Sequence, residues 1–185
     1  KDLLSVVSND IVLEVVLHFG TLLSILVYFR KEIHLLIMGL IEWDLTSVRY
    51  VMYIVLSTFP VILFVLFFED RVMSAFNINT LGPAYLFTGL VLLSTKFVQN
   101  GRKRRIGMQS AVIMGLAQVL AVFPGISRAG ITICTGLLLG YNQRAVAKFS
   151  FFMAIPALMG AVIFEYENII QSLSAEFTII FLGFL

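Results

Sequence analysis

Charged residues and cysteines are scarce in this sequence. Only 13% of the 185 residues are charged, the formal net charge is +2, and a single cysteine, Cys134, is present. One cysteine cannot form an intrachain disulfide or a cysteine-based metal site. A net charge this small gives no argument for nucleic-acid binding. In contrast, 59% of the residues are hydrophobic and the mean hydropathy is +0.98, well above the apolar share of a typical soluble domain. We therefore interpret residues 1–185 as a single, all-α, polytopic integral membrane domain.

Long apolar stretches bounded by charged residues predict the transmembrane helices. A bilayer requires about 20 mostly apolar residues for each helical span. Full-length spans are predicted at Ile11–Phe29, Val48–Phe68, Leu81–Val98 and Ala145–Phe164. A last apolar run extends from Phe177 to Leu185, and the sequence does not begin with Met. We therefore expect a fragment that is truncated at both ends.

Two shorter apolar stretches, Met108–Phe123 and Ile131–Tyr141, are separated by the turn sequence PGISRAG. Each is too short to cross a bilayer comfortably. Basic residues mark cytoplasmic loops, and here they occur in the first loop and on both sides of the short pair: Arg30, Lys31, Arg49, Lys96, Arg102, Lys103, Arg104, Arg105, Arg144 and Lys148. A re-entrant hairpin over about residues 108–141, with both ends in the cytoplasm, accounts for this distribution.

Arg128 is the one basic residue deep within an apolar region. An unpaired Arg at the bilayer centre costs about 2.5 kcal/mol or more, so its presence suggests a function. The planar guanidinium suits bidentate contact with phosphate oxygens. Irregular backbone at membrane depth must be buried in protein or line a water-filled cavity. The turn around Arg128 is therefore predicted to line a ligand cavity.

The neighbours of Arg128 also favour an anion. Gly125 permits a sharp turn, Ser127 offers a hydroxyl, and Gly130 permits close approach of the backbone to a ligand. A helix is predicted to start near Ile131, with Thr132 in its first turn, and free N–H groups at such a helix end bind anions. We predict a phosphate or diphosphate site here.

Two structural alternatives stay open at this point. Arg128 could snorkel or pair with a buried acid such as Glu14, while the Pro-Gly pair merely kinks a helix. Glu14 and His18 lie one helical turn apart and face the same side of the first span. They could position water, bind a metal or pair with Arg128, or they could be solvated near the outer interface.

The stretch FPGISRAGITI, followed by FSFFMAIPALMGA, resembles the undecaprenyl-diphosphate phosphatase family, also known for bacitracin resistance. The early segment VLEVVLHFGTLLSILVYFRK is similar to that family as well, so the resemblance covers nearly the whole chain. Ala129 departs from the family pattern, which more often has Ser there. The resemblance implies an inverted-repeat fold with two re-entrant hairpins, in the cell membrane, with the active site facing the extracytoplasmic side.

The same resemblance implies an activity, which is hydrolysis of undecaprenyl diphosphate to undecaprenyl phosphate and inorganic phosphate. Ser127 and Arg128 would be catalytic, and Gly125, Gly130 and Thr132 would bind phosphate. It also implies a divalent cation such as Mg²⁺ or Ca²⁺. No metal ligand is identified in this chain, because the family's glutamate-rich first loop would precede Lys1, and Glu14 and His18 are at most auxiliary.

Other functions use similar elements. A transporter or flippase for an anionic polyprenyl lipid could bind its cargo with broken helices and an Arg without hydrolysing it. Glutamates and a His upstream of Lys1 would favour hydrolysis. A homodimer stays open as the state of assembly.

Overall fold

The computed structural model describes three stretches of the chain, residues 19–74, 78–98 and 101–164. In these stretches the regular secondary structure is helical, apart from one isolated parallel bridge between Lys103 and Tyr141. The all-α prediction is therefore confirmed for the described part of the chain.

The chain divides into two compact units. One unit comprises residues 34–153 and contains the turn around Arg128. The other combines residues 1–33 with residues 154–185. The candidate site lies entirely in the first unit, so we describe that unit in most detail.

The first helices follow the predicted apolar pattern. Residues Phe19–Tyr28 form an apolar helix, and α2 follows at Arg30–Ile41. The predicted span Ile11–Phe29 is thus helical over its described part, while residues 11–18 lie outside the described residues.

Helix α3, Leu45–Ser74, contains the second predicted span. Its segment Leu45–Phe68 is the one helix of the described residues that is long and apolar enough to cross a membrane. Asp44 precedes the helix and accepts hydrogen bonds from the backbone N–H and hydroxyl of Ser47, both at 2.9 Å. These bonds stabilise the carboxylate and lower the pKa of Asp44 below its ordinary value. The backbone leaves helical geometry at Phe68 (φ −128°, ψ 26°), where the predicted span ends.

Helix α4, Ile78–Ser94, corresponds to the predicted span Leu81–Val98 but ends four residues earlier. The hydroxyl of Ser94 donates to the carbonyl of Val91 (2.6 Å), and a 3₁₀ turn, Thr95–Phe97, follows. Hydrogen bonds from side-chain hydroxyls to nearby backbone carbonyls compete with the regular backbone hydrogen bonds of a helix. Helix α7, Gln143–Phe164, covers the last full-length predicted span.

The two short arms form a helical hairpin, and its re-entrant placement in a membrane stays a prediction. Helix α5 extends over Met108–Val119 and continues in a 3₁₀ turn, Leu120–Val122, and α6 extends over Arg128–Leu138. The prediction that the second helix starts near Ile131 was wrong. The helix begins three residues earlier because the side chain of Ser127 caps it.

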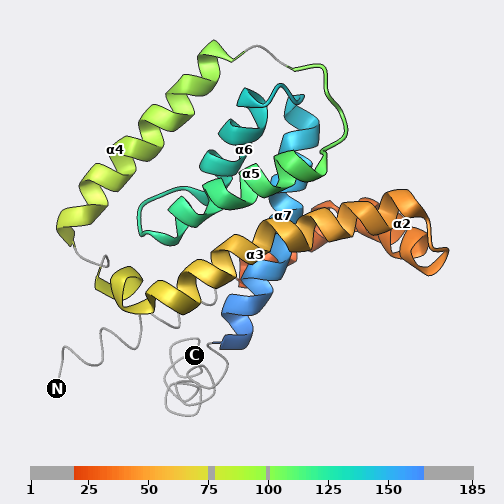
Figure 1. Ribbon diagram of the computed structural model, residues 1–185, viewed down its shortest axis with the longest axis horizontal. Coiled ribbons are helices and arrows are strands. Elements are labelled where there is room, and N and C mark those ends of the chain that lie inside the picture. Colours follow the sequence, from red (N-terminus) through yellow and green to blue (C-terminus); the bar gives the residue numbers. More distant parts are fainter. Residues whose placement is uncertain (1–18, 75–77, 99–100, 165–185) are drawn as a thin grey trace, which may run out of the picture. The chain divides into compact units, whose positions relative to one another are not determined.

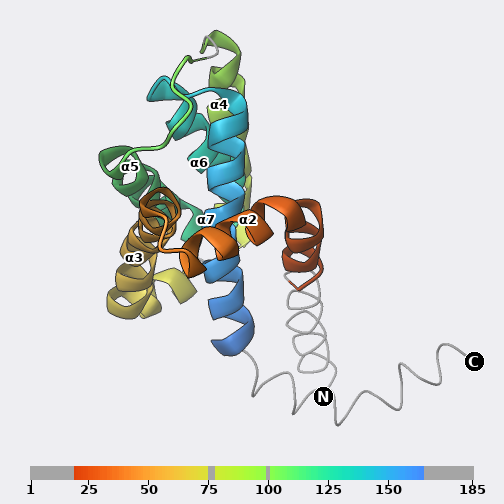
Figure 2. The ribbon, with the colours of Figure 1, turned by 90° about the vertical axis from the view of Figure 1, so that its right-hand side faces the viewer.

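Small residues allow the helices of this unit to pack closely. Helix α5 lies between α3 and α6, and α6 also packs against α4 (Figures 1 and 2). A Cβ at Gly115 of α5 would lie 2.3 Å from the carbonyl oxygen of Ser57 in α3, and a Cβ at Gly136 would lie 2.6 Å from a methyl of Val146. No larger side chain fits at these contacts, which is typical of helices in membranes.

The two ends of the hairpin meet. The N–H of Lys103 donates to the carbonyl of Gly140 (3.3 Å), and the N–H of Asn142 donates to the carbonyl of Lys103 (2.9 Å). The Tyr141 hydroxyl lies 2.9 Å from that of Ser110 and accepts from the N–H of Gly107 (3.3 Å). The segment before α5 is thus fixed to the segment after α6.

Candidate functional site: the turn before helix α6

The turn between α5 and α6 requires a glycine. Gly125 has a φ of +86°, which L-residues with a side chain rarely adopt. A Cβ at this position would also lie 2.9 Å from the Cβ of Ala84 in α4. Pro124, whose φ is restricted by its ring, precedes this glycine. The sequence-based expectation of a sharp turn at Pro-Gly is confirmed.

Thr88 of α4 holds this turn in place. Its hydroxyl donates to the carbonyl of Gly125 (3.0 Å) and accepts from the N–H of Ser127 (3.1 Å). The side chain is buried, so both main-chain groups of the turn are satisfied away from water. Sequence analysis missed Thr88. The sequence feature that could have identified it is a hydroxyl side chain within the apolar run LFTGLVLL.

Ser127 is the N-cap of α6. Its hydroxyl oxygen accepts from the N–H of Gly130 at 3.1 Å, and its backbone is extended (φ −71°, ψ 112°). Gly130 therefore lies within the first turn of α6 rather than before the helix. A Cβ there would lie 3.2 Å from Leu92 of α4, so the glycine permits close helix packing.

Arg128 is the first residue of α6, and its side chain is only partly exposed. One terminal nitrogen donates to the amide oxygen of Gln118 in α5 (3.0 Å) and to the carbonyl oxygen of Met153 in α7. Both acceptors are neutral, and no carboxylate of the described residues pairs with the guanidinium. A positive charge without a counter-ion, at the positive end of a helix dipole, favours an anionic ligand.

Gln118 was also missed by sequence analysis. It is 2% exposed, and while its amide oxygen accepts from Arg128, its amide nitrogen has no hydrogen-bond partner among the described residues. A buried donor without a partner is costly, by about 1–3 kcal/mol. A ligand oxygen beside Arg128 would satisfy it. The sequence feature that could have identified Gln118 is the one amide side chain in the apolar stretch AVIMGLAQVLAVF.

Thr132 lies one turn into α6 and is fully buried. Its hydroxyl donates to the carbonyl of Arg128 (2.9 Å) and lies 2.6 Å from the hydroxyl of Ser150 in α7. These contacts join α6 to α7 and steady the first turn of α6. Direct binding of phosphate by Thr132 stays a prediction.

Two further candidates from the sequence, Glu14 and His18, were considered as possible metal ligands. Glu14 and His18 lie outside the described residues, so their proximity to Arg128 stays a prediction. In residues 19–74, 78–98 and 101–164, no group of three His, Cys, Asp or Glu side chains converges. The donors around Arg128 are neutral amide, hydroxyl and carbonyl groups, and this set does not fit a divalent cation, which prefers carboxylate oxygens.

Comparison with known proteins places these residues in a family. The chain matches the family described as bacitracin resistance protein BacA over residues 1–185. It is similar to the undecaprenyl-diphosphatase of Bacteroides fragilis, with 38% identity over 166 residues, which are 88% of this chain and 62% of that protein. The same name belongs to a relative from Caldicellulosiruptor bescii, with 36% identity over 95% of this chain and 68% of the relative. A Christiangramia forsetii relative is 34% identical over 98% of this chain and 70% of its own length. The chain spans about 62% of the length of several of the curated relatives it matches. It is therefore a member of the bacitracin resistance protein BacA family.

Proposed function

We propose that this chain is part of a membrane-bound phosphatase that hydrolyses undecaprenyl diphosphate. The observation that carries the proposal is Arg128, a cation at the start of α6 that pairs with no carboxylate of the described residues, beside the amide nitrogen of Gln118, which has no partner among them. The names of the relatives support a diphosphate as the substrate. The products are undecaprenyl phosphate, a lipid carrier for cell-wall synthesis, and inorganic phosphate.

In this proposal Arg128 and Gln118 bind the terminal phosphate. Water adds to the terminal phosphorus, the bond from that phosphorus to the bridging oxygen breaks, and the lipid leaves as a monophosphate. The negative charge on the transferred phosphoryl group is stabilised by the guanidinium and by the amide N–H of Gln118. The bonds of Gln118 and Met153 to Arg128 fix the direction of its side chain in advance, which lowers the reorganisation that catalysis needs.

Ser127 and Gly125 serve the site through the backbone. The Ser127 oxygen accepts from the N–H of Gly130, and its hydroxyl proton donates to none of the described residues, so it could donate to a phosphate oxygen. Gly125 and Thr88 determine where the first turn of α6 points. A nucleophilic role for Ser127 is a separate outcome, which a trapped phosphoseryl intermediate would reveal.

The divalent cation implied by family resemblance is not assigned to any described residue, and we derive no step through it. We propose that its ligands, together with an acid or base, come from parts of the protein outside residues 19–164. We further propose that α5 and α6 form a re-entrant hairpin within an inverted repeat of a multi-pass protein, with the active site facing the extracytoplasmic side. Support comes from the short arms, the basic residues at both ends of the hairpin and the meeting of those ends.

The deciding experiment uses the full-length protein, purified in detergent or reconstituted in vesicles. Release of inorganic phosphate from undecaprenyl diphosphate is expected with a suitable divalent cation, and loss of that release is expected in Arg128→Ala. If the protein released no phosphate with any divalent cation but moved labelled lipid between leaflets, the transporter alternative would replace this proposal.

A further inference from the structure

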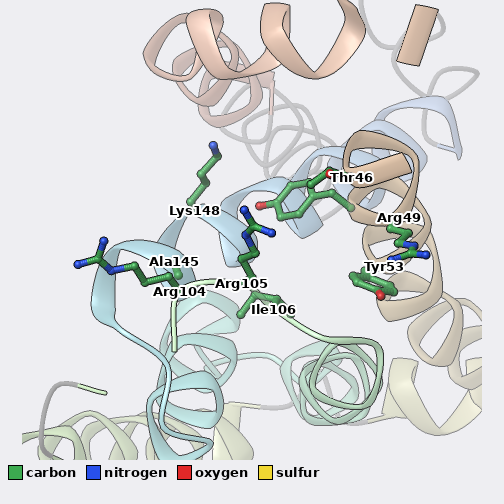
Figure 3. A pocket seen from close by; sticks show the side chains of 9 residues that line it. Thr46, Arg49, Tyr53, Arg104, Arg105, Ile106, Ala145 and Lys148 are labelled. Atoms are coloured by element: carbon green, nitrogen blue, oxygen red, sulfur yellow. The ribbon is translucent and has the colours of Figure 1, made fainter. Parts of the chain in front are cut away.

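A second basic site lies at the other end of the hairpin from Arg128. It is a pocket with a volume of about 320 Å³, and four of the nine residues that line it are cationic. Arg49 comes from α3, Arg104 and Arg105 come from the segment before α5, and Lys148 comes from α7. Figure 3 shows these side chains around the opening, with Tyr53 and Thr46 of α3 beside them. All of these residues belong to the unit of residues 34–153.

The described part of the chain does not neutralise the charges of this pocket. None of its lining residues is acidic, and none of the four cations forms an ion pair with a described residue. The nearest compensation is a cation–π contact, in which the Lys148 ammonium lies 5.6 Å from the centre of the Phe152 ring. Four cations around one cavity repel one another, so an anion that contacts several of them is stabilised.

The backbone holds the cations in place. Arg104 and Arg105 directly follow Lys103, whose N–H and C=O pair with Gly140 and Asn142. A Cβ at Gly101 would clash with the carbonyl of Gly140, so the two segments are in close contact there. The two arginines therefore belong to a fixed rim, not to a free basic tail.

Aromatic contacts fix the other two sides of the pocket. The Tyr50 ring of α3 meets the rings of Phe149 and Phe152 of α7 edge to face, with centroids 5.7 and 5.9 Å apart. These contacts set the separation between Arg49, next to Tyr50, and Lys148, next to Phe149. The pocket is thus built by three elements that are distant in sequence.

The position of the pocket indicates which class of anion it binds. Thr46, Arg49 and Tyr53 lie in the first turns of Leu45–Phe68, the helix able to cross a membrane, so the pocket lies at the level of a membrane surface. Tyr side chains are typical of this level. Large apolar side chains at the same helix end are free for acyl chains, since Trp43 is 82% exposed and Leu45 is 69% exposed. A basic pocket between helices at this depth fits the head group of an anionic lipid.

We propose that this pocket binds the phosphate head group of an anionic phospholipid, on the side that the positive-inside rule predicts as cytoplasmic. The site is separate from the turn at Arg128. Helix α6 has 11 residues, so its two ends lie about 15 Å apart at 1.5 Å per residue, with Arg128 at one end and the pocket rim beside the other.

The test measures lipid binding to the full-length protein in detergent by native mass spectrometry, with short-chain phosphatidylglycerol, phosphatidylcholine of the same chain length and inorganic phosphate as separate ligands. Phosphatidylglycerol is expected to bind at least about tenfold more tightly than phosphatidylcholine, because only the former carries a net charge for the arginines. Equal affinity for the two lipids would overturn the proposal. Inorganic phosphate that binds as tightly as phosphatidylglycerol would overturn the assignment to a lipid.

A matched pair of double variants separates the pocket from general surface charge. Arg104→Gln/Arg105→Gln removes two charges from the pocket, and Arg102→Gln/Arg144→Gln removes two exposed charges that do not line it. The first is expected to weaken phosphatidylglycerol binding about tenfold or more, and the second by less than about threefold. Equal losses in both variants, or none in the first, would reject the pocket. Thermal unfolding of both variants in detergent verifies that they are folded.

Discussion

The guanidinium of Arg128 donates a hydrogen bond to the amide oxygen of Gln118 across 3.0 Å. This contact joins the start of α6 to the last turn of α5, on opposite sides of the turn that connects them. Within the described part of the chain, the other end of the Gln118 amide is a buried donor without a partner. Because the described residues hold Arg128 through an amide and not through a carboxylate, its charge stays available for a ligand, which is the basis of the first two predictions.

Arg128→Lys is expected to lower phosphate release about 100-fold or more, almost as far as Arg128→Ala. An ammonium cannot reproduce the planar fork that contacts Gln118 and a phosphoryl group together, and loss of one such donor costs about 3 kcal/mol in the transition state. The assay is phosphate release by the full-length variants in detergent. Arg144→Lys, at an exposed position on α7, is the control and should keep its activity. Full activity in a folded Arg128→Ala protein would show that Arg128 has a structural role and not a catalytic one.

Gln118→Glu tests whether the free amide donor serves the substrate. The new carboxylate keeps an acceptor for Arg128 and pairs with it, but it removes the donor and places a negative charge beside the phosphate. We expect activity to fall about 100-fold while the folded state is kept, because charge repulsion acts on the ligand and not on the protein. The measurements are phosphate release and thermal unfolding of the same samples. Unchanged activity in Gln118→Glu would show that this amide does not face the phosphate.

Thr88→Val tests the contact that holds the turn. The substitution keeps the shape of the side chain but leaves the Gly125 carbonyl and the Ser127 N–H without their buried partner, at a cost of about 1–3 kcal/mol for each group. We expect a lower unfolding temperature and reduced activity. Thr135→Val is the control, because the Thr135 hydroxyl donates to the carbonyl of Ile131 within its own helix (2.8 Å) and to no other described residue. Equal effects of the two substitutions would mean that the turn does not depend on Thr88.

Gly125→Ala is expected to destabilise the protein by about 1–2 kcal/mol from the left-handed backbone alone, with a further loss from the approach to Ala84. Gly89→Ala in α4 is a matched control. A Cβ at that helical position meets nothing within 4 Å, so it should stabilise by about 0.5–1 kcal/mol. Thermal or denaturant unfolding of both variants gives the comparison, and an opposite order would contradict the assigned turn.

Cysteine labelling tests whether both ends of the hairpin lie on the cytoplasmic side, as a re-entrant hairpin requires. In a Cys134→Ala background, single cysteines at Arg102 and Arg144, both exposed, should react with an impermeant reagent only from the cytoplasmic side. A cysteine at Asp70, in the part of α3 that follows the predicted span Val48–Phe68, should react only from the other side, because one predicted span separates it from the first loop. Reaction of the Arg102 and Arg144 positions from opposite sides would mean that residues 108–141 cross the membrane.

Much of the fold and part of the site could be predicted from the sequence because they depend on local properties. The apolar run Val48–Phe68 predicted a helix whose end coincides with the break at Phe68, and the Pro-Gly pair predicted a turn that requires a positive φ. Arg128 could be singled out as a candidate because a charged residue within an apolar stretch is recognised from the sequence alone. The start of α6 was misplaced by three residues, since PGISRAG contains both a turn signal and a cap and only the bond from Gly130 to Ser127 decides between them.

The contacts between distant residues were decided by the tertiary structure. Gln118 and Thr88 each lie in apolar helices, where a single polar residue is as often a packing detail as a ligand, and 10 and 40 residues separate them from Arg128. Their roles appear only when α4, α5 and α6 pack together. Likewise the sequence by itself predicted that Arg49, Arg104, Arg105 and Lys148 lie on one side of a membrane, because such a prediction follows from charge counts along the chain. Their convergence on one pocket depends on the pairing of Lys103 with Gly140 and of Tyr50 with Phe149, which no local pattern encodes.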